Sequence, residues 1–362
     1  MKKYIIIGLI VIVGGGMLIY PLISGEEPEE ERTPAVFAFE EHLATVGDEV
    51  APLKINVVEE LSKLELFYND SLFQTWNDVK GDVEYELPAG IFGIGTRRIY
   101  LLSTYADGKT LDDSRFVRVL SDIIPEKLEA NILNEYPHNP QSFTQGLEFW
   151  NGKLYEGTGD PSDIGATVVT EVELETGEHL KSMGLSVGYF GEGITILDST
   201  LYQLTYKKGK CYTYSVEDLQ LKGEFNYQGE GWGLCNDGTQ LIMSNGTERI
   251  TFLDPETFTT IRTIEVYNNK GPIVNLNELE YIDGKIYANV WTTSIVVVID
   301  PITGKVLQEI DGIKLIRKAG GDGQTKVLNG VAKDKSTGKI YMTGKYWSTL
   351  FEVEFKPTAP NS

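Results

Sequence analysis

Cysteine and histidine are scarce in this chain of 362 residues. The two cysteines, Cys211 and Cys235, are too few for the disulfide framework of a small secreted domain, and we expect buried free thiols. The three histidines, His42, His138 and His179, show no metal-ligand spacing, and the sequence has no Cys-x-x-Cys pair. It therefore predicts no structural or catalytic zinc, and we expect no metal and no other cofactor.

Positive charge is also in short supply. The chain has 32 lysines and arginines against 53 aspartates and glutamates, which gives a formal net charge of -21. A surface with this excess of negative charge repels phosphate backbones. We therefore exclude nucleic acid as a partner and expect the charge to serve solubility.

A long hydrophobic run opens the chain at residues 4–23. Its length of about twenty residues matches the hydrocarbon core of a bilayer. Lys2 and Lys3 precede the run and glutamates follow it, which by the positive-inside tendency leaves the rest of the chain outside. We expect residues 1–24 to form a transmembrane helix that anchors a periplasmic or extracellular protein. The alternative is a cleaved signal peptide, for which Ser24-Gly25 is a poor cleavage site.

The next two segments carry no candidate chemistry. Residues 25–34, GEEPEEERTP, combine charge with proline and predict an unfolded acidic linker. Residues 35–125 contain short alternating segments separated by turn signals such as Asn69-Asp70 and Asp107-Gly108. This pattern predicts a small immunoglobulin-like β-sandwich, which we interpret as a spacer or an interaction module.

A repeated motif appears beyond the sandwich. It consists of an apolar start, a turn and a second strand that ends in Tyr or Ile. The five copies lie at 146–155, 193–202, 233–242, 279–287 and 330–341. A spacing of roughly 40 to 50 residues fits one four-stranded blade per copy, so residues 126–358 are predicted to form a five-bladed β-propeller. Residues 130–133 are placed to complete the last blade and close the ring.

Propeller geometry selects the candidate site. The strand nearest the axis begins each blade, so the loops before the five repeats should converge on one mouth of the central channel. Glu192 stands there between two glycines, and an aromatic pocket would raise its pKa toward the range of a general acid or base. Lys345 lies on the inner half of the final blade, where it is suited to polarise a carbonyl oxygen.

Aromatic residues of the same loops predict an apolar box around these two charges. Phe143, Phe190, Tyr206, Trp232 and Trp291 all map to inner or mouth positions. Ordinary packing between blades is the alternative for one or two of them.

Several motifs occur in the order found in a known enzyme family. They are YPHNPQSFTQGL at 136–147, YFGEG at 189–193, EGWGL at 230–234, NELEY at 277–281, ANVW at 288–291, NGVA at 329–332 and TGK at 343–345. Together they resemble the plant-type glutaminyl-peptide cyclotransferases, which occur in plants and many bacteria, and this chain would be a membrane-anchored bacterial member. The resemblance implies a metal-free five-bladed propeller that converts the N-terminal Gln of peptides or proteins to pyroglutamate and releases ammonia.

The resemblance also implies roles for individual residues. Glu192 falls on the family's catalytic glutamate and Lys345 on its catalytic lysine. The substrate-site residues fall on Phe143, Gln145, Phe190, Trp232, Asn277 and Trp291. One departure is Tyr206, which stands where the family usually has Trp, so that pocket width and substrate preference are open.

Two other functions compete with the cyclase. A metal-dependent, lactonase-like hydrolase propeller would use Glu192 and Asn277 as two of its ligands. A non-enzymatic propeller would bind peptides without releasing ammonia. For the cyclase we expect a monomer whose partners are Gln-initiated peptides and, through the N-terminal segment, a membrane.

Overall fold

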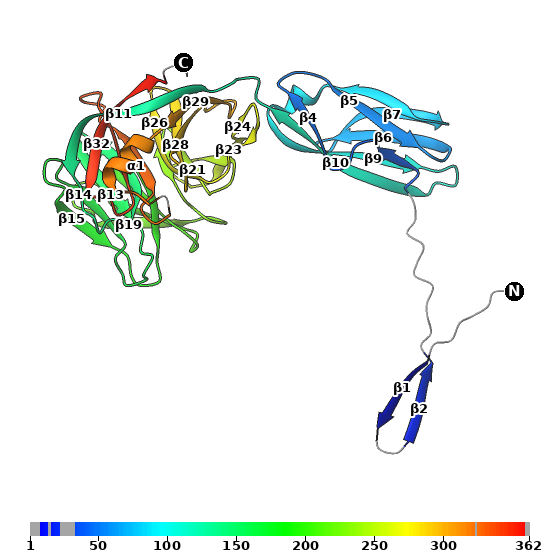
Figure 1. The fold of residues 1–362 in the computed structure, drawn as a ribbon, viewed down its shortest axis with the longest axis horizontal. Coiled ribbons are helices and arrows are strands. Elements are labelled where there is room, and N and C mark those ends of the chain that lie inside the picture. Colours follow the sequence, from blue (N-terminus) through cyan, green and yellow to red (C-terminus); the bar gives the residue numbers. More distant parts are fainter. Residues whose placement is uncertain (1–7, 14–15, 22–32, 323, 359–362) are drawn as a thin grey trace. The chain divides into compact units, whose positions relative to one another are not determined.

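The computed structural model describes residues 8–13, 16–21, 33–322 and 324–358, and most of them lie in β-strands (Figure 1). The chain divides into two compact units, and the larger one contains every strand from residue 126 onward.

The N-terminal apolar segment differs from the expected transmembrane helix. Strands β1 (Gly8–Val13) and β2 (Gly16–Pro21) pair antiparallel, with Gly8 opposite Pro21. The predicted helix is therefore wrong for these residues, and the other residues of 1–24 lie outside the described part of the chain. The β-branched residues of this run favour strands, and its glycines weaken a helix. No helix in the described ranges has the length and apolar character needed to cross a membrane.

The region before residue 125 forms two sheets. One has the order β3-β5-β8 and the other the order β4-β10-β9-β6-β7. Strand β5 alternates buried Ala51, Leu53 and Ile55 with exposed residues, the pattern of a sheet with one face in a core. The immunoglobulin-like topology stays a prediction. The strands are β3 (Ala35–Phe37), β4 (His42–Val46), β5 (Ala51–Val57), β6 (Leu61–Tyr68), β7 (Ser71–Val79), β8 (Val83–Leu87), β9 (Gly95–Thr104) and β10 (Thr110–Leu120), with a 3-10 turn η1 at Ala89–Phe92.

The five repeats each open a four-stranded antiparallel blade. Blade 1 is β12 (Thr144–Trp150), β13 (Lys153–Thr158), β14 (Val168–Val172) and β15 (His179–Gly184). Blade 2 is β16 (Gly191–Leu197), β17 (Thr200–Thr205), β18 (Lys210–Ser215) and β19 (Leu221–Asn226). Blade 3 is β20 (Leu234–Asn236), β21 (Leu241–Ser244), β22 (Arg249–Leu253) and β23 (Thr260–Glu265).

Blades 4 and 5 form one eight-stranded sheet that closes the ring. Blade 4 is β26 (Leu276–Ile282), β27 (Lys285–Val290), β28 (Ile295–Ile299) and β29 (Val306–Asp311). Blade 5 is β30 (Leu328–Lys333), β31 (Ile340–Gly344), β32 (Thr349–Pro357) and the earlier strand β11 (Glu126–Pro137). Ala130 pairs with Phe355, as predicted, and the start of β11 also pairs in parallel with β29. The closing strand thus covers two edges at once.

The first strand of each blade lies at the centre of a closed ring. β12 contacts β16, β16 contacts β20, β20 contacts β26, β26 contacts β30, and β30 contacts β12. Glycine permits this close approach. A side chain at Gly193 would lie 2.4 Å from the Leu234 nitrogen, and one at Gly233 would lie 2.0 Å from the Asn277 oxygen. This crowding explains why a glycine opens the repeats of blades 2 and 3.

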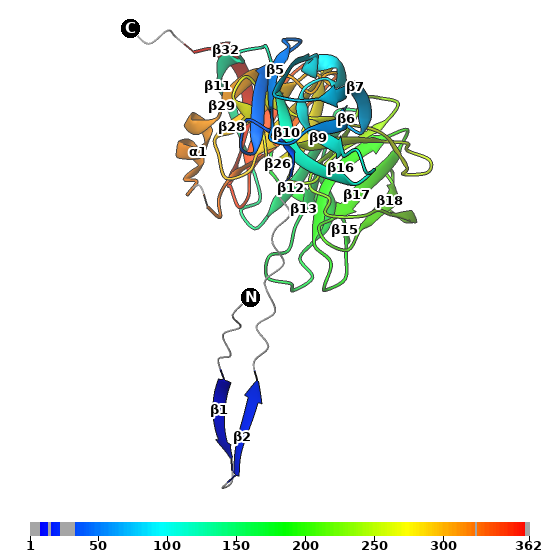
Figure 2. The same ribbon diagram turned by 90° about the vertical axis from the view of Figure 1, so that its right-hand side faces the viewer.

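Hydrophobic cores fill the spaces between adjacent blades. Leu204 and Cys211 of blade 2 pack with Leu241 of blade 3, and Cys235 of blade 3 packs with Leu279 of blade 4. Both cysteines are buried and free, as predicted, because they belong to two different cores. Two short elements, β24 (Tyr267–Asn268) and β25 (Gly271–Pro272), follow β23. Helix α1 (Ile313–Ala319) lies beside β11 (Figure 2).

Candidate active site

A pocket of about 440 Å³ lies at the mouth where the innermost strands begin. All nine residues that the sequence singled out line it: Phe143, Gln145, Phe190, Glu192, Tyr206, Trp232, Asn277, Trp291 and Lys345. The structure therefore brings together residues from all five blades. Their catalytic and binding roles stay predictions.

Irregular backbone at the start of the innermost strands positions these side chains. The strand register shifts between Thr144 and Gly146, between Gly191 and Ile194, between Leu276 and Leu279, and between Leu328 and Val331. A β-bulge leaves a residue out of the ladder and turns its side chain. The shifts in blades 1, 2 and 4 enclose the pocket residues Gln145, Glu192 and Asn277, and the shift in blade 5 encloses Asn329.

Glu192 is the buried carboxylate of the pocket. Its side chain is on β16 and the residue is 4% exposed. Burial raises the pKa of Glu192 well above its ordinary range, the charge of Lys345 opposes this rise, and the charge of Glu230 adds to it. Among the described residues, no hydrogen bond or ion pair reaches its carboxylate. A carboxyl group with a raised pKa is suited both to accept and to donate a proton.

Lys345 is the buried cation. It follows β31, is 3% exposed, and its backbone nitrogen donates to the Val327 oxygen at 2.9 Å. The Lys345 Nζ lies 4.5 Å from the centre of the Phe143 ring, a favourable cation–π distance. Burial lowers the pKa of Lys345 to about 8, although the negative charge of Glu192 acts in the opposite direction.

Five aromatic rings form a continuous arc along the pocket wall. The ring centres are 5.9 Å apart for Phe143 and Phe190, 5.8 Å for Phe190 and Tyr206, 6.3 Å for Tyr206 and Trp232, and 5.6 Å for Trp232 and Trp291. Edge-to-face and tilted contacts of this kind hold the rings against one another. The arc confirms that these residues form a box, and none of the five is confined to packing between blades.

Amide side chains complete the pocket. The Asn277 Oδ1 atom is buried and has no hydrogen-bond partner among the described residues. The Gln145 Oε1 atom accepts a hydrogen bond from Asn329 Nδ2 at 3.3 Å. A buried carbonyl oxygen without a donor is costly unless a ligand supplies one. Asn277 is therefore placed to accept a hydrogen bond from an amine or amide of a bound molecule.

Comparison with known proteins identifies the family. A family model described as glutamine cyclotransferase matches residues 109–355. The chain belongs to the glutamine cyclotransferase family. A glutaminyl-peptide cyclotransferase of Arabidopsis thaliana is 37% identical over 242 residues, which are 65% of this chain and 73% of the relative. The crystal structure of Myxococcus xanthus glutaminyl cyclase matches with a TM-score of 0.62 and 37% identity over 65% of this chain and 100% of that one.

The structure adds site residues of this cyclotransferase that the sequence analysis missed. Pro161, Gln324, Thr325, Val327 and Tyr346 also line the pocket. Asn329, which bonds to Gln145, occupies in blade 5 the position that Glu192 occupies in blade 2. The sequence did contain a signal for Asn329, because it lies directly before the fifth repeat in the motif NGVA. The loop containing Gln324 and Thr325 belongs to no repeat, so the repeat pattern gave no signal for it.

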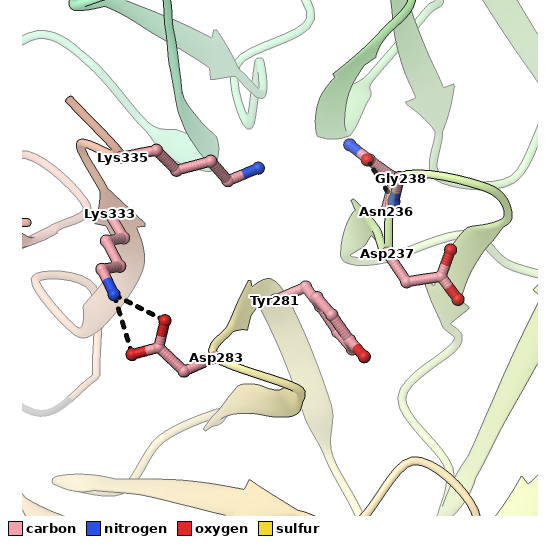
Figure 3. Close-up of a pocket in the computed structure, with 7 residues that line it drawn as sticks. All are labelled: Asn236, Asp237, Gly238, Tyr281, Asp283, Lys333 and Lys335. Carbon is pink, nitrogen blue, oxygen red and sulfur yellow. Dashed lines mark hydrogen bonds and ion pairs between the residues drawn. The ribbon is translucent and has the colours of Figure 1, made fainter.

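A second cavity of about 320 Å³ lies at the other end of the innermost strands. Figure 3 shows its lining residues, Asn236, Asp237, Gly238, Tyr281, Asp283, Lys333 and Lys335, none of which lines the cyclotransferase pocket. Lys333 Nζ donates to both carboxylate oxygens of Asp283, at 2.7 and 2.8 Å. The Lys335 ammonium extends into the space between the blades (Figure 3). Burial raises the pKa of Glu148 to about 7, and the charge of Lys335 opposes this rise.

Proposed function

We propose that this cyclotransferase converts N-terminal Gln to pyroglutamate with Glu192 as general acid and base and Lys345 as the oxyanion partner. The observation that carries the proposal is the burial of both groups, without hydrogen-bond partners in the described part of the chain, in one aromatic pocket. Family membership favours this function over a lactonase or a peptide-binding propeller.

The first step forms the ring. The neutral α-amine of the substrate Gln attacks the carbon of its own side-chain amide, and the carbonyl electron pair moves to the oxygen. The carboxylate of Glu192 accepts a proton from the amine nitrogen. The Lys345 ammonium stabilises the oxyanion, and a preorganised donor of this kind contributes about 3 to 4 kcal/mol.

The second step releases ammonia. Glu192 delivers its proton to the former amide nitrogen, the bond between that nitrogen and carbon breaks, and the carbonyl re-forms. Glu192 returns to its starting state, so no further reactant is needed. The raised pKa of Glu192 suits this exchange, because the same group must both take and give a proton.

The other pocket residues would hold the substrate in the reactive conformation. The aromatic arc surrounds the aliphatic part of the Gln side chain and folds it back toward its own amine. Asn277 Oδ1 accepts a hydrogen bond from the amine or the amide, and Gln145 orients the same groups. We expect Tyr206 to add a hydroxyl to this wall where relatives usually carry a larger ring.

The activity is tested with the purified full chain and a peptide that begins with Gln. We expect ammonia release and the matching loss of mass from the peptide. The same peptide with an acetylated α-amine is the control, because it lacks the nucleophile and must not react. Equal reaction of both peptides, or reaction of neither, would contradict the proposed chemistry.

We further propose that residues 4–23 attach the chain to a membrane and leave the propeller outside it as a monomer. The apolar composition of the run and the charges that flank it support this location. The immunoglobulin-like region would then separate the enzyme from the membrane surface. Cell fractionation of the full chain and of a variant without residues 1–24 tests the attachment, and sedimentation tests the monomer.

A further inference from the structure

A buried polar network joins blade 1 to blade 5 behind the pocket. His138, which directly follows β11, lies at its centre and is 5% exposed. Its Nδ1 atom lies 2.7 Å from the Trp347 oxygen, and its Nε2 atom lies 3.1 Å from Glu156 Oε1. A carbonyl oxygen accepts hydrogen bonds and cannot donate one, and the same is true of a carboxylate. Both ring nitrogens must therefore donate, which makes His138 an imidazolium paired with the carboxylate of Glu156.

The surroundings of Glu156 support this charge state. Thr144 Oγ1 donates to its Oε1 atom at 2.7 Å, and Ser142 Oγ donates to its Oε2 atom at 3.1 Å. Burial alone would raise the pKa of Glu156, but His138, His179 and Thr144 hold it below its ordinary range. Burial alone would lower the pKa of His138, but Glu156 and the Trp347 carbonyl hold it above its ordinary value.

The network reaches the pocket through neighbouring residues on the chain. Ser142 and Thr144 contact Glu156, while the residues that follow them, Phe143 and Gln145, line the pocket. Successive side chains of an extended chain point in opposite directions, so one segment serves both environments. Fixing Ser142 and Thr144 therefore fixes the orientation of Phe143 and Gln145.

On the other side the network holds the turn that carries Lys345. His138 binds the Trp347 oxygen through its ring and the Ser348 oxygen through its backbone nitrogen, at 3.0 Å. The Tyr346 nitrogen donates to the Ser142 oxygen at 2.7 Å. Tyr346 has a φ of 59°, a left-handed conformation that is costly for a residue with a side chain. The contacts with His138 and Ser142 hold this turn closed.

We propose that the His138–Glu156 pair is a positioning device that holds Lys345 over Phe143 and inside the pocket. Neither residue of the pair lines the pocket, so both act through the two segments that they join. Without the pair the turn at Tyr346 would relax and the Lys345 ammonium would move toward solvent. The inference rests on the proposed role of Lys345.

A double-mutant cycle tests the pair. We expect His138→Gln and Glu156→Gln each to lower kcat by about 10²-fold with little change in KM, the loss typical of a misplacement of about 1 Å. In a Lys345→Met background, the same substitutions should lower the remaining kcat by less than about tenfold, because the main group that they position is gone and only the effect on Phe143 and Gln145 is left. Equal losses in both backgrounds would show a general structural role and overturn the proposal.

His179→Gln is the matched control. The His179 Nε2 atom lies 3.6 Å from Glu156 Oε2, but His179 makes no contact with blade 5 among the described interactions. We expect its kcat to stay within about twofold of wild type, because the contact is long and does not join Glu156 to blade 5. A loss as large as that of His138→Gln would show that any change near Glu156 disturbs the site, which contradicts a device specific to the blade junction.

A second readout is independent of catalysis. The pKa of the Lys345 amine, followed by NMR of the labelled lysine, should be near 8 in the wild type and rise toward about 10.4 in His138→Gln, as the amine gains solvent. An unchanged pKa in a folded variant would overturn the positioning role. If the wild type released no ammonia, the proposed function would fail, while this measurement would still decide whether the pair holds Lys345.

Discussion

The two ends of the propeller channel carry the same kinds of charged side chains in opposite settings. At the active-site mouth, the side chains of Glu192 and Lys345 are buried among aromatic rings and have no hydrogen-bond or ion-pair partner in the described chain. At the other mouth, Lys333 binds Asp283 through both carboxylate oxygens, and Asp283 is largely exposed. Lys333 and Asp283 bind each other and Asp283 faces solvent, whereas Glu192 and Lys345 are compensated by each other's charge and, for Lys345, by the Phe143 ring.

This difference shows where the fold gives up stability for chemistry. A buried charge without hydrogen bonds destabilises the folded state, so it persists only where the surrounding structure is strong enough to hold it. The inter-blade cores supply that strength around the whole ring. Burial also raises the pKa of Glu148 near the other mouth, so what distinguishes the active-site end is a carboxyl group and an amine that are both perturbed within one pocket.

The largest effect is expected at Glu192. We expect Glu192→Gln to lower kcat by about 10³-fold, since general acid–base catalysis contributes about 10²- to 10⁴-fold. Ammonia release under saturating peptide measures it. The variant keeps the shape of the side chain and removes its proton exchange, so a fully active Glu192→Gln enzyme would sink the assigned role.

Lys345→Met should act in opposite directions on activity and stability. We expect kcat to fall by about 10²-fold through loss of oxyanion stabilisation. The free energy of unfolding should rise by about 1 kcal/mol, because Met has a similar volume and carries no buried charge. Ammonia release and denaturant unfolding measure the two effects. A variant that is both inactive and less stable would contradict the expectation that the buried charge of Lys345 destabilises the folded state.

The pH dependence should separate activity from stability in the same way. The pKa of Lys345 is about 8 when folded, below its ordinary value. Activity should fall as pH rises through about 8, because the ammonium is lost. Between that pH and about 10.4 the unfolded state binds more protons than the folded state, so stability should rise with pH. The difference between the free energies of unfolding of the wild type and of Lys345→Met, measured against pH, isolates this contribution. A difference that does not change with pH would refute the lowered pKa of Lys345.

Tyr206 is expected to have a smaller effect. Its ring contacts Phe190 and Trp232, and the Lys207 Nζ lies 4.7 Å from its centre. Tyr206→Phe keeps these ring contacts and removes the hydroxyl, so we expect kcat/KM to change by less than about fivefold, the value of one hydrogen bond. Tyr206→Trp should narrow the pocket and raise KM for peptides with a bulky second residue. Identical KM values for small and bulky peptides in both variants would exclude a role in substrate preference.

The smallest effect is expected at the opposite mouth. Lys333→Met should leave kcat and KM unchanged and alter stability by less than about 1 kcal/mol, as is typical of an ion pair near the surface. It replaces a lysine by methionine just as Lys345→Met does, so it is the matched control for that variant. A tenfold loss of activity in Lys333→Met would break the contrast between the two ends.

The periodicity of the sequence predicted the fold and most of the site residues. The five repeats predicted the blades, and residues 130–133 predicted the closing strand. The nine site residues were found because each lies in or next to a repeat or a family motif. The N-terminal segment shows the limit of this approach, since hydrophobicity alone predicted a helix where the described residues pair as strands. Gln324 and Thr325 were missed because no periodic pattern places their loop.

The sequence by itself determined which residues could do chemistry and that five similar hairpins would surround an axis. A repeat unit buries its apolar face only against its neighbour, so each copy of the repeat carries the apolar residues that this packing requires. Only the tertiary structure decided the state of those residues. The bulges at Glu192 and Asn277 turn these side chains into the pocket, where they are buried. The contacts of His138 with Glu156 and Trp347 join residues that lie far apart in the sequence. Local sequence does not encode the desolvation that sets a pKa.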